Sequence, residues 1–279
     1  MSKICFLITA HKNQNQLLRL INHLKKDFDI YVHIDKKSKL NLKTFDNVKI
    51  YKKYKVYHAE VSQIISTLFL INEAYENNYD RYVFISGQDV PLKTNKEIID
   101  FFNTNKNSEF ISYESTKHNS HLKKWEDIRL NHYCSNSRIN RVFHSSVRKF
   151  IFALLPNRKT IENVYFGSSW WNLTNNAVKY ILEYIQKSPD FLKRFYHTWG
   201  GDEYFFQSIL LNSLFKENCV NDGLRYIDWS EKYGSNPVTF RFEDYDNIKN
   251  NIRNNLFARK FDENIDNDII DKLYKDLES

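Results

Sequence analysis

Strand-like and helix-like patterns alternate through the first hundred residues. Residues 3–9 form a short apolar run, residues 15–26 carry apolar side chains at helical spacing, and residues 29–35 alternate between apolar and polar as a strand does. A second helical stripe follows at 60–76, and an apolar run closed by a glycine turn covers 81–89. This alternation predicts an α/β fold with a mostly parallel sheet and helices on both faces.

Four polar residues lie at the carboxyl ends of three of these strands. His11 lies just beyond the first strand, Asp35 ends the second, and Gln88 and Asp89 end the third. The carboxyl ends of parallel strands meet at one edge of the sheet, where ligands bind in folds of this kind. We therefore expect these side chains on the ligand side of the sheet, although a turn or cap role explains an isolated His or Asp equally well.

The second half of the chain is less regular. Residues 113–148 mix charged and aromatic side chains without a long apolar run, which predicts loops over the site. Beyond residue 164, helical patterns occur at 175–186 and after Glu203, a strand-like pattern at 224–229, and a helical pattern at the end.

The sequence contains no sign of a boundary between domains. It has only 6 Gly and 4 Pro, with no linker rich in either residue and no internal repeat. We expect one domain over residues 1–279, in which 1–112 form a nucleotide-binding half and 113–279 an acceptor and catalytic half.

The charge balance favours an anionic partner. The formal net charge is +7 and the pI is near 9.0. Lysine is spread along the whole chain and does not form one basic stripe with interleaved aromatics. A nucleic-acid partner is therefore not expected.

The apolar runs are short. The longest, such as 150–155, fall far below the roughly 20 residues of a transmembrane helix, and the first residues lack the features of a signal peptide. Cys5, Cys134 and Cys219 are odd in number and widely spaced, which argues against a disulfide framework and a zinc site. We expect a cytoplasmic protein with reduced thiols.

Residues 198–210, with the sequence TWGGDEYFFQSIL, place an acid directly after a turn. Glu203 follows two glycines and Asp202 and opens an apolar, helix-like run. A carboxylate at the positive end of a helix is favoured in its ionised form, which suits a general base at neutral pH. The alternative is structural: a turn, an N-cap at Asp202 and a first-turn acid.

Five segments are unusual in combination: YVHIDKKS at 31–38, ISGQDVPLK at 85–93, GSSWWNLT at 167–174, GGDEYFF at 200–206 and LFARKFD at 256–262. In this order and spacing they resemble the core-2/I-branching N-acetylglucosaminyltransferase and peptide O-xylosyltransferase family, across nearly the whole chain. The resemblance implies a GT-A type α/β nucleotide-sugar-binding fold, a UDP-sugar donor, inversion at the anomeric centre and no divalent metal.

The residues agree with a reaction that uses no metal. Nucleotide-sugar enzymes of this fold usually hold Mg²⁺ or Mn²⁺ with Asp-x-Asp after a central strand, because hard cations prefer carboxylate oxygens. The matching strand ends in Ser-Gly-Gln-Asp at 86–89, with one acid, and Asp-x-Asp at 244–246 and 266–268 is better explained by helix capping. We expect no metal and no other cofactor, so that Lys and Arg neutralise the departing UDP.

The resemblance also assigns residues to the donor. By resemblance, Asp35 contacts the uracil or ribose. From their places at the strand ends, and not from the resemblance, we expect His11 and His33 in the same pocket and Gln88 and Asp89 at the same edge of the sheet.

In LFARKFD, Lys260 falls by resemblance on the family's diphosphate-binding lysine. The family uses an upstream arginine as well, and the length of the intervening segment leaves Arg225 and Arg241 both open. On the motif alone, Arg259 and Lys260 are better explained as a solvated pair flanking a small hydrophobic contact.

Glu203 aligns with the family's catalytic base. A base in this position deprotonates an acceptor hydroxyl as its oxygen attacks the anomeric carbon, while UDP leaves from the opposite face. One carboxylate is enough for this displacement, whereas most glycosidases need two. Asp202 is assigned to capping and orientation.

The candidates for sugar contacts lie in GSSWW and in the polar segment. Small residues in GSSWW allow close backbone approach, and two adjacent tryptophans can offer one ring to a sugar while the other packs inward. Core packing of both rings is the alternative. The candidates for sugar and acceptor contacts are Ser169, Trp170, Trp171 and Asp202, with Glu114, Lys124 and Trp125 where the family binds its acceptor.

The leading hypothesis is an inverting, metal-independent glycosyltransferase that moves N-acetylglucosamine from UDP to a glycan hydroxyl, often through a β1,6 linkage in the resembling enzymes. UDP-xylose, UDP-glucose and UDP-galactose are alternative donors, and a non-catalytic nucleotide- or glycan-binding protein is an alternative class. We expect the protein to lack the membrane anchor and the cysteine-rich stem of Golgi-resident relatives. We therefore expect a bacterial enzyme that builds surface polysaccharide on a lipid-linked oligosaccharide and contacts the inner membrane face through its positive charge.

Overall fold

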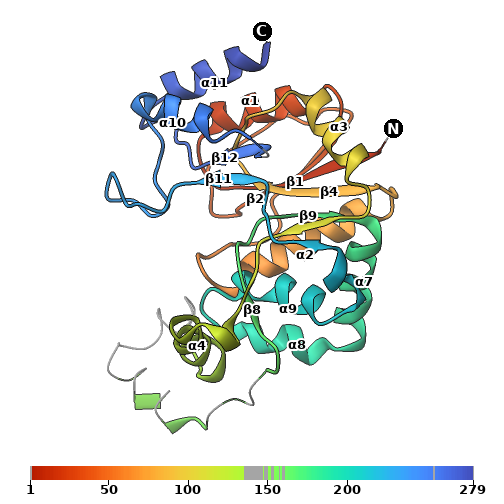
Figure 1. Ribbon diagram of the computed structural model, residues 1–279, viewed down its shortest axis with the longest axis vertical. Helices are drawn as coiled ribbons and strands as arrows, with labels where there is room; N and C mark the ends of the chain where they lie inside the picture. Colours follow the sequence, from red (N-terminus) through yellow and green to blue (C-terminus); the bar gives the residue numbers. More distant parts are fainter. Residues whose placement is uncertain are drawn as a thin grey trace.

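The described chain forms a seven-stranded sheet at the centre of the molecule (Figure 1). The computed structural model describes residues 2–134, 147, 150–151, 154–156, 158, 161–253 and 255–278. In order across the sheet, its strands are β10 (Cys219–Val220), β6 (Glu109–Ile111), β9 (Trp171–Thr174), β4 (Arg81–Ser86), β1 (Ile4–Ala10), β2 (Asp29–Ile34) and β3 (Val48–Tyr51). Among these described strands β9 alone pairs antiparallel with its neighbours. The predicted mostly parallel α/β sheet is confirmed.

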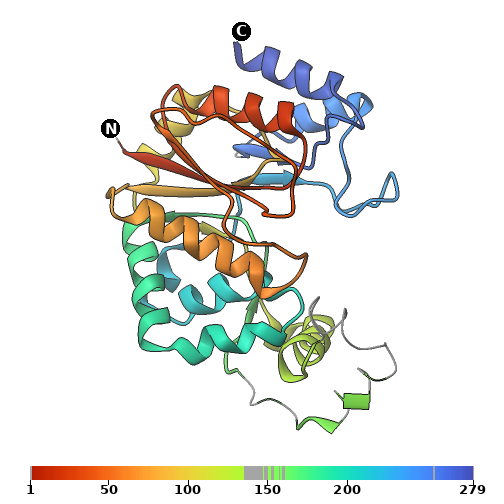
Figure 2. The same cartoon turned by 180° about the vertical axis from the view of Figure 1, so that it is seen from behind.

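Helices cover both faces of this sheet (Figures 1 and 2). On one side lie α1 (Gln14–Leu24) and α3 (Asn95–Thr104), and on the other lie α2 (Val61–Tyr75), α7 (Asn175–Lys187), α8 (Pro189–Arg194) and α9 (Phe205–Leu211). Successive side chains of β1 point to opposite faces of the sheet and enter two different hydrophobic clusters. Phe6 and Ile8 pack in the cluster with α1, whereas Cys5 and Leu7 pack in the cluster with α2.

A smaller sheet of three described strands lies beside the turn that follows β4. Its order is β11 (Arg225–Ile227), β12 (Phe257–Arg259) and β5 (Val90–Pro91). It packs in a third hydrophobic cluster with α10 (Tyr245–Asn250) and α11 (Asp268–Glu278). Because β5 follows the turn after β4, this sheet brings residues 225 and 259 next to that turn.

The segment predicted to form loops over the site contains regular structure. β7 (Glu114–Ser115) pairs with β8 (Tyr165–Phe166), and α4 (Ser120–Glu126) continues into a π-helical turn at Asp127–Asn131. Asn119 starts α4, because its side chain accepts hydrogen bonds from two backbone N–H groups of the first turn. The prediction of loops is therefore wrong for 114–131, and positions 135–146 and 148 lie outside the described residues.

The remaining described helices are single 3-10 turns at Thr116–His118, Phe195–His197, Gly201–Glu203, Leu214–Asn218 and Phe242–Asp244. None of the described helices combines the length and the apolar character that a membrane crossing requires. Cys5, Cys134 and Cys219 are described and are free thiols. Strands from both expected halves share the central sheet, and the domain boundaries stay a prediction.

Candidate functional site

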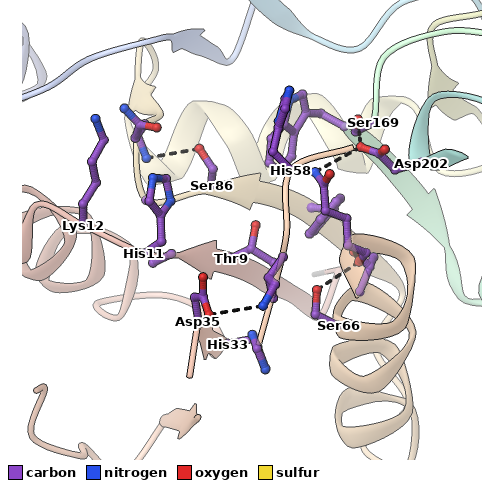
Figure 3. Close-up of a pocket in the computed structure, with 18 of the residues that line it drawn as sticks. Thr9, His11, Lys12, His33, Asp35, His58, Ser66, Ser86, Ser169 and Asp202 are labelled. Atoms are coloured by element: carbon purple, nitrogen blue, oxygen red, sulfur yellow. Dashed lines mark hydrogen bonds between the residues drawn. The ribbon is translucent and has the colours of Figure 1, made fainter. Parts of the chain in front are cut away.

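A cavity of about 380 Å³ opens at the carboxyl ends of β1, β2 and β4 (Figure 3). The three strands are parallel and adjacent, so the residues that follow them meet at one edge of the sheet. Gln63, Ser66 and Thr67 close the cavity from α2. The predicted site residues that line it are His11, His33, Asp35, Gln88, Ser169, Trp170 and Asp202.

Asp35 is fixed by the backbone around it. Its Oδ1 accepts hydrogen bonds from the N–H groups of Lys37 and Val56, at 2.9 and 3.2 Å, and its Oδ2 lies 3.3 Å from the Lys37 ammonium. The carboxylate is buried and still lines the cavity. It is therefore placed to accept hydrogen bonds from hydroxyl or ring N–H groups of a ligand.

The two predicted histidines are largely neutral at pH 7. Burial lowers the pKa of His33 to about 4, and its Nε2 accepts a hydrogen bond from the Tyr54 N–H at 3.1 Å. Burial, followed by the charge of Lys12, lowers the pKa of His11. His33 thus forms a wall of the cavity with one ring nitrogen already occupied by the protein.

Cations gather at one end of the cavity. Lys12 and Arg259 line it, and Lys260 follows Arg259 in the chain without lining the cavity itself. Burial lowers the pKa of Lys260, and the charges of Arg259 and Lys12 lower it further, as neighbouring cations do. Lys12 also pairs with Asp262 at 2.5 Å. Together these side chains suit an anionic group such as a diphosphate.

Asp89, Arg225 and Arg241 do not line the cavity, contrary to the prediction. Asp89 is fully buried, and its Oδ1 lies 2.8 Å from Nε of Arg225, which is buried as well. Arg241 is exposed, and its guanidinium carbon lies 4.4 Å from the centre of the Tyr233 ring. Burial removes the first two from direct contact with a ligand, and Arg241 packs on an aromatic ring instead.

Ser169 and Trp170 reach the cavity from the loop before β9. Ser169 Oγ donates to Asp202 Oδ2 at 2.6 Å, and Gln63 Nε2 donates to the same oxygen at 3.2 Å. Trp170 lines the cavity, whereas Trp171 is fully buried in the core. Trp171 is therefore not placed to contact a sugar, and the core alternative describes it correctly.

Gly167 lets this loop approach its neighbours closely. A Cβ at this position would lie 1.9 Å from the carbonyl oxygen of Ser112. The Gly167 N–H donates to the Glu203 carbonyl at 2.8 Å. The missing side chain thus permits the close approach to Ser112, and the backbone hydrogen bond connects the loop to the candidate base.

Glu203 ends the 3-10 turn Gly201–Glu203, directly after the cavity residue Asp202. Its Oε2 lies 2.8 Å from Arg129 Nη1. Burial, followed by the Asp202 carboxylate, raises the pKa of Glu203 to about 7, although Arg129 acts in the opposite direction. The carboxylate therefore exchanges its proton near neutral pH, as a general base at that pH must.

The local structure around Glu203 differs from the predicted helix start. α9 begins only at Phe205, and no described side chain caps it. Asp202 accepts hydrogen bonds from Ser169 and Gln63, so its predicted capping role is wrong. The expectation that the position favours ionised Glu203 is also wrong, because burial and Asp202 raise the pKa.

The chain also matches a known family. The family model described as Core-2/I-Branching enzyme covers residues 4–254. The chain belongs to the Core-2/I-Branching enzyme family. This membership confirms the predicted resemblance and the assignment to a glycosyltransferase family. The seven-stranded sheet confirms the predicted α/β class.

The curated relatives are xylosyltransferases at low identity. Xylosyltransferase 2 of Pan troglodytes is 24% identical over 310 residues, which cover 97% of this chain and 33% of that protein. Xylosyltransferase 1 of Rattus norvegicus is 22% identical over 308 residues, which cover 97% of this chain and 35% of that protein. The chain thus spans about one third of the length of these relatives.

Solved structures resemble the chain weakly. A197 from STIV has a TM-score of 0.29 and 9% identity, and the match covers 63% of this chain and 67% of A197. A likeness this low supports no conclusion about the site.

The acceptor candidates of this Core-2/I-Branching family member lie on β7 and α4. Glu114 and Lys124 are exposed. Trp125 is 39% exposed, and the centre of its ring lies 4.4 Å from the guanidinium carbon of Arg129. Trp125 is thereby connected to Glu203 through Arg129.

Several residues at the site were not predicted. Lys12 adjoins a predicted position and Arg259 lies inside LFARKFD, so the sequence held a signal for both. Gln63 approaches from the start of α2, where the local pattern does not mark it. Arg129 lies in the segment predicted as loops, and the fold brings it to Glu203.

Metal binding has no support from the acids near the cavity. The described part of the chain contains no group of three or more His, Cys, Asp or Glu side chains that could hold a metal ion. In the Asp-x-Asp sequences, Asp244 accepts from the Arg241 N–H and Asp266 from the Ile269 N–H, which stabilises helix starts as predicted. Independence of a metal stays a prediction.

Proposed function

We propose that the chain is an inverting glycosyltransferase that moves a sugar from a UDP-sugar to a hydroxyl of a glycan acceptor. One observation carries the proposal: the cavity has cations at one end, and at the other a carboxylate that lines it and adjoins a base with a pKa of about 7 (Figure 3). A diphosphate leaving group requires the cations, and an acceptor hydroxyl requires the base.

In this proposal the donor spans the cavity. Its volume of about 380 Å³ falls in the usual range of ligand pockets. Asp35 binds the nucleoside. The side chains that bind the diphosphate are those of Arg259, Lys12 and Lys260. Trp170 and Ser169 border the transferred sugar. Asp202 accepts hydrogen bonds from sugar hydroxyls in addition to those from the protein.

The chemical step is a single displacement. The acceptor oxygen bonds to the anomeric carbon while Glu203 takes the hydroxyl proton, and the bond from that carbon to the UDP oxygen breaks with its electron pair on UDP. The configuration at the carbon is thereby inverted. The negative charge that develops on UDP is neutralised by the lysine and arginine side chains, and we propose that no divalent metal is needed.

The identity of the sugar has two supported candidates. The motifs that resemble the family favour UDP-GlcNAc, whereas the names of the curated relatives favour UDP-xylose. Trp170 and Ser169 border the proposed sugar position and do not by themselves define a pocket for an N-acetyl group.

We further propose that the acceptor is a lipid-linked glycan of bacterial surface polysaccharide synthesis. The net charge of +7 supports contact with an anionic inner membrane face. Sedimentation of the protein with vesicles containing phosphatidylglycerol, but not with phosphatidylcholine vesicles alone, is the expected result. Equal sedimentation with both, or with neither, would remove this part of the proposal.

Calorimetric titration tests the proposed function. Purified protein is titrated with UDP, UDP-GlcNAc, UDP-xylose and UDP-glucose in EDTA and then in Mn²⁺. Binding in EDTA is expected, with a preference for one UDP-sugar. That preference identifies the donor. Absence of binding, or binding only with Mn²⁺, would contradict the proposed neutralisation by Arg259, Lys12 and Lys260.

A further inference from the structure

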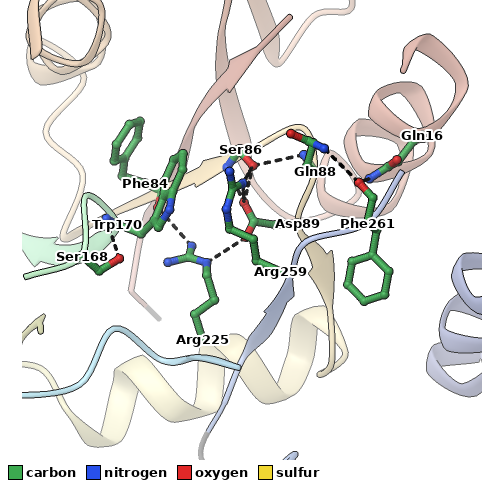
Figure 4. A network of polar contacts seen from close by, with 10 residues as sticks. All are labelled: Gln16, Phe84, Ser86, Gln88, Asp89, Ser168, Trp170, Arg225, Arg259 and Phe261. Carbon is green, nitrogen blue, oxygen red and sulfur yellow. Dashed lines mark hydrogen bonds and ion pairs between the residues drawn. The ribbon is translucent and has the colours of Figure 1, made fainter. Parts of the chain in front are cut away.

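A buried ion network adjoins the cation end of the cavity (Figure 4). Asp89 Oδ1 accepts from Arg225 Nε at 2.8 Å, and Asp89 Oδ2 accepts from the backbone N–H and the hydroxyl of Ser86, at 2.5 and 2.8 Å. Arg259 Nη1 lies 3.7 Å from the same Oδ2 and donates to the Ser86 hydroxyl. One carboxylate therefore holds two guanidinium groups.

The network is assembled by four strand ends. Ser86 ends β4, Asp89 directly precedes β5, Arg225 begins β11 and Arg259 ends β12. β12 pairs with both β5 and β11, so the register of the small sheet sets the distance between the two arginines and the carboxylate. The positions of these charges depend on the backbone and not on flexible surface side chains.

The network carries one positive charge in excess. Burial lowers the pKa of both Arg225 and Arg259, and Asp89 acts against that shift in each case. Arg225 Nη1 is buried without a hydrogen-bond partner among the described residues. A buried charge is costly unless it is paired, so this cluster favours a further anion.

Arg259 is the member of the pair that reaches the ligand space. Its side chain is 17% exposed and lines the cavity, whereas the side chain of Arg225 is 2% exposed. The Trp170 ring covers both guanidinium groups, with its centre 4.7 Å from Cζ of Arg259 and 5.4 Å from Cζ of Arg225. Such stacking fixes the plane of a guanidinium group and shields it from water.

We infer that Arg225 and Asp89 are positioning residues that hold the Arg259 guanidinium at the cavity wall, where it binds an anionic oxygen of a nucleoside diphosphate. The inference rests on the proposed function. The sequence suggested Arg225 as one candidate for direct contact with the diphosphate. In the inferred role, Arg225 acts through Asp89 and touches no ligand.

The Asp89→Asn variant tests the inference, because charge and position predict opposite results. Loss of the carboxylate charge makes the cluster more positive, which by charge alone strengthens UDP binding. If the Asp89 carboxylate holds the Arg259 guanidinium in place, the amide that replaces it cannot hold two guanidinium groups, and the affinity for UDP falls about tenfold. Uridine lacks the diphosphate, so its affinity stays unchanged. UDP is measured by calorimetry and uridine by ligand-observed NMR.

Two further variants control for folding. Arg225→Lys keeps the charge but loses the fork that spans Asp89 and the Phe84 carbonyl, so UDP affinity falls while uridine affinity does not. Arg81→Lys is the matched control: Arg81 is an equally buried arginine at the other end of β4, where it donates to backbone carbonyls. It leaves the ratio of UDP to uridine affinity unchanged.

The outcomes separate the inference from the proposed function. Unchanged or tighter UDP binding by Asp89→Asn, or a parallel loss of UDP and uridine binding, overturns the positioning role. If the Asp89→Asn variant does not fold, the ratio of UDP affinity to uridine affinity in Arg225→Lys tests the positioning role instead. A wild-type protein that binds uridine and UDP equally well, or neither, overturns the proposed function itself.

Discussion

Arg129 Nη1 lies 2.8 Å from Glu203 Oε2, although the two residues are 74 positions apart in the chain. The ion pair favours the ionised form of Glu203, while burial and Asp202 favour the protonated form. The result is a pKa of about 7 for Glu203. Arg129 thereby both orients the candidate base and keeps a useful fraction of it ionised at neutral pH.

Glu203→Gln is expected to lower turnover by about 10² to 10⁴ fold, the usual contribution of a general base. The amide is similar in shape but does not accept the acceptor proton. Donor binding is expected to persist, because Glu203 does not line the cavity. Turnover and UDP-sugar affinity are measured together, with Glu183→Gln on the exposed face of α7 as control. Full turnover by the Glu203 variant would assign the base to another residue.

Arg129→Gln is expected to shift the pH profile of kcat/KM. Removal of the cation raises the pKa of Glu203, so the ionised base appears only at higher pH, and the acidic limb moves up by about one pH unit. Activity therefore falls most at pH 6 and recovers above pH 8. Arg19→Gln, which removes a surface ion pair with Asp271, serves as control and leaves the limb in place. An unmoved limb in Arg129→Gln would show that the pair does not tune the base.

Glu203 is also expected to make folding stability depend on pH. Its pKa is raised from 4.5 to about 7 on folding, so the unfolded chain releases this proton first and the native state loses stability as pH rises through that window. Gln has no such proton. At pH 8 the free energy of unfolding of Glu203→Gln is therefore expected to exceed that of the wild type by on the order of 1 kcal/mol, after allowance for partial exposure. At pH 4 no such difference is expected. Denaturation at both pH values measures the difference, and an equal offset at both would contradict the raised pKa.

The strong local patterns of the first hundred residues predicted the order of β1, α1, β2, α2 and β4. Each of these elements has enough apolar positions to reveal its period, and their parallel order fixes the edge at which His11 and Asp35 lie. β9 and β12 were not predicted, because four and three residues are too few to show a period. Their pairing is decided by partners that are distant in sequence.

The roles of individual charges at the site depended on tertiary contacts. The sequence placed Asp89 at a strand end, but the approach of β11 and β12 decided that its carboxylate faces two arginines and not the cavity. Arg129 carried no local signal, because its function requires the contact with Glu203. The identities of the motif residues were thus predictable, whereas the direction in which each side chain points was not.

Gly200→Ala is expected to disturb the base as well as the backbone. Gly200 has φ +66°, and a Cβ there would lie 3.0 Å from Arg129 Nη1 and 3.1 Å from Glu203 Oε2. Gly234→Ala is a matched control, with φ +70° and no described atom within 4 Å of the added Cβ. Both variants lose about 1 kcal/mol of stability from the left-handed backbone, and only Gly200→Ala loses turnover. Equal turnover in both would show that the ion pair adapts to the methyl group.

Trp170→Phe and Trp171→Phe are expected to affect different properties, although the two residues are adjacent. Trp171 is fully buried against Phe84 and Phe206, so the smaller ring leaves a void and lowers the free energy of unfolding by about 2 kcal/mol. Trp170 lines the cavity and covers Arg259, so its replacement costs less stability but weakens UDP-sugar binding about fivefold, within the range of one cation–π contact. Chemical denaturation and calorimetry on both variants measure the two effects. A binding loss confined to Trp171→Phe would mean that the cavity wall is set by the core and not by the Trp170 ring.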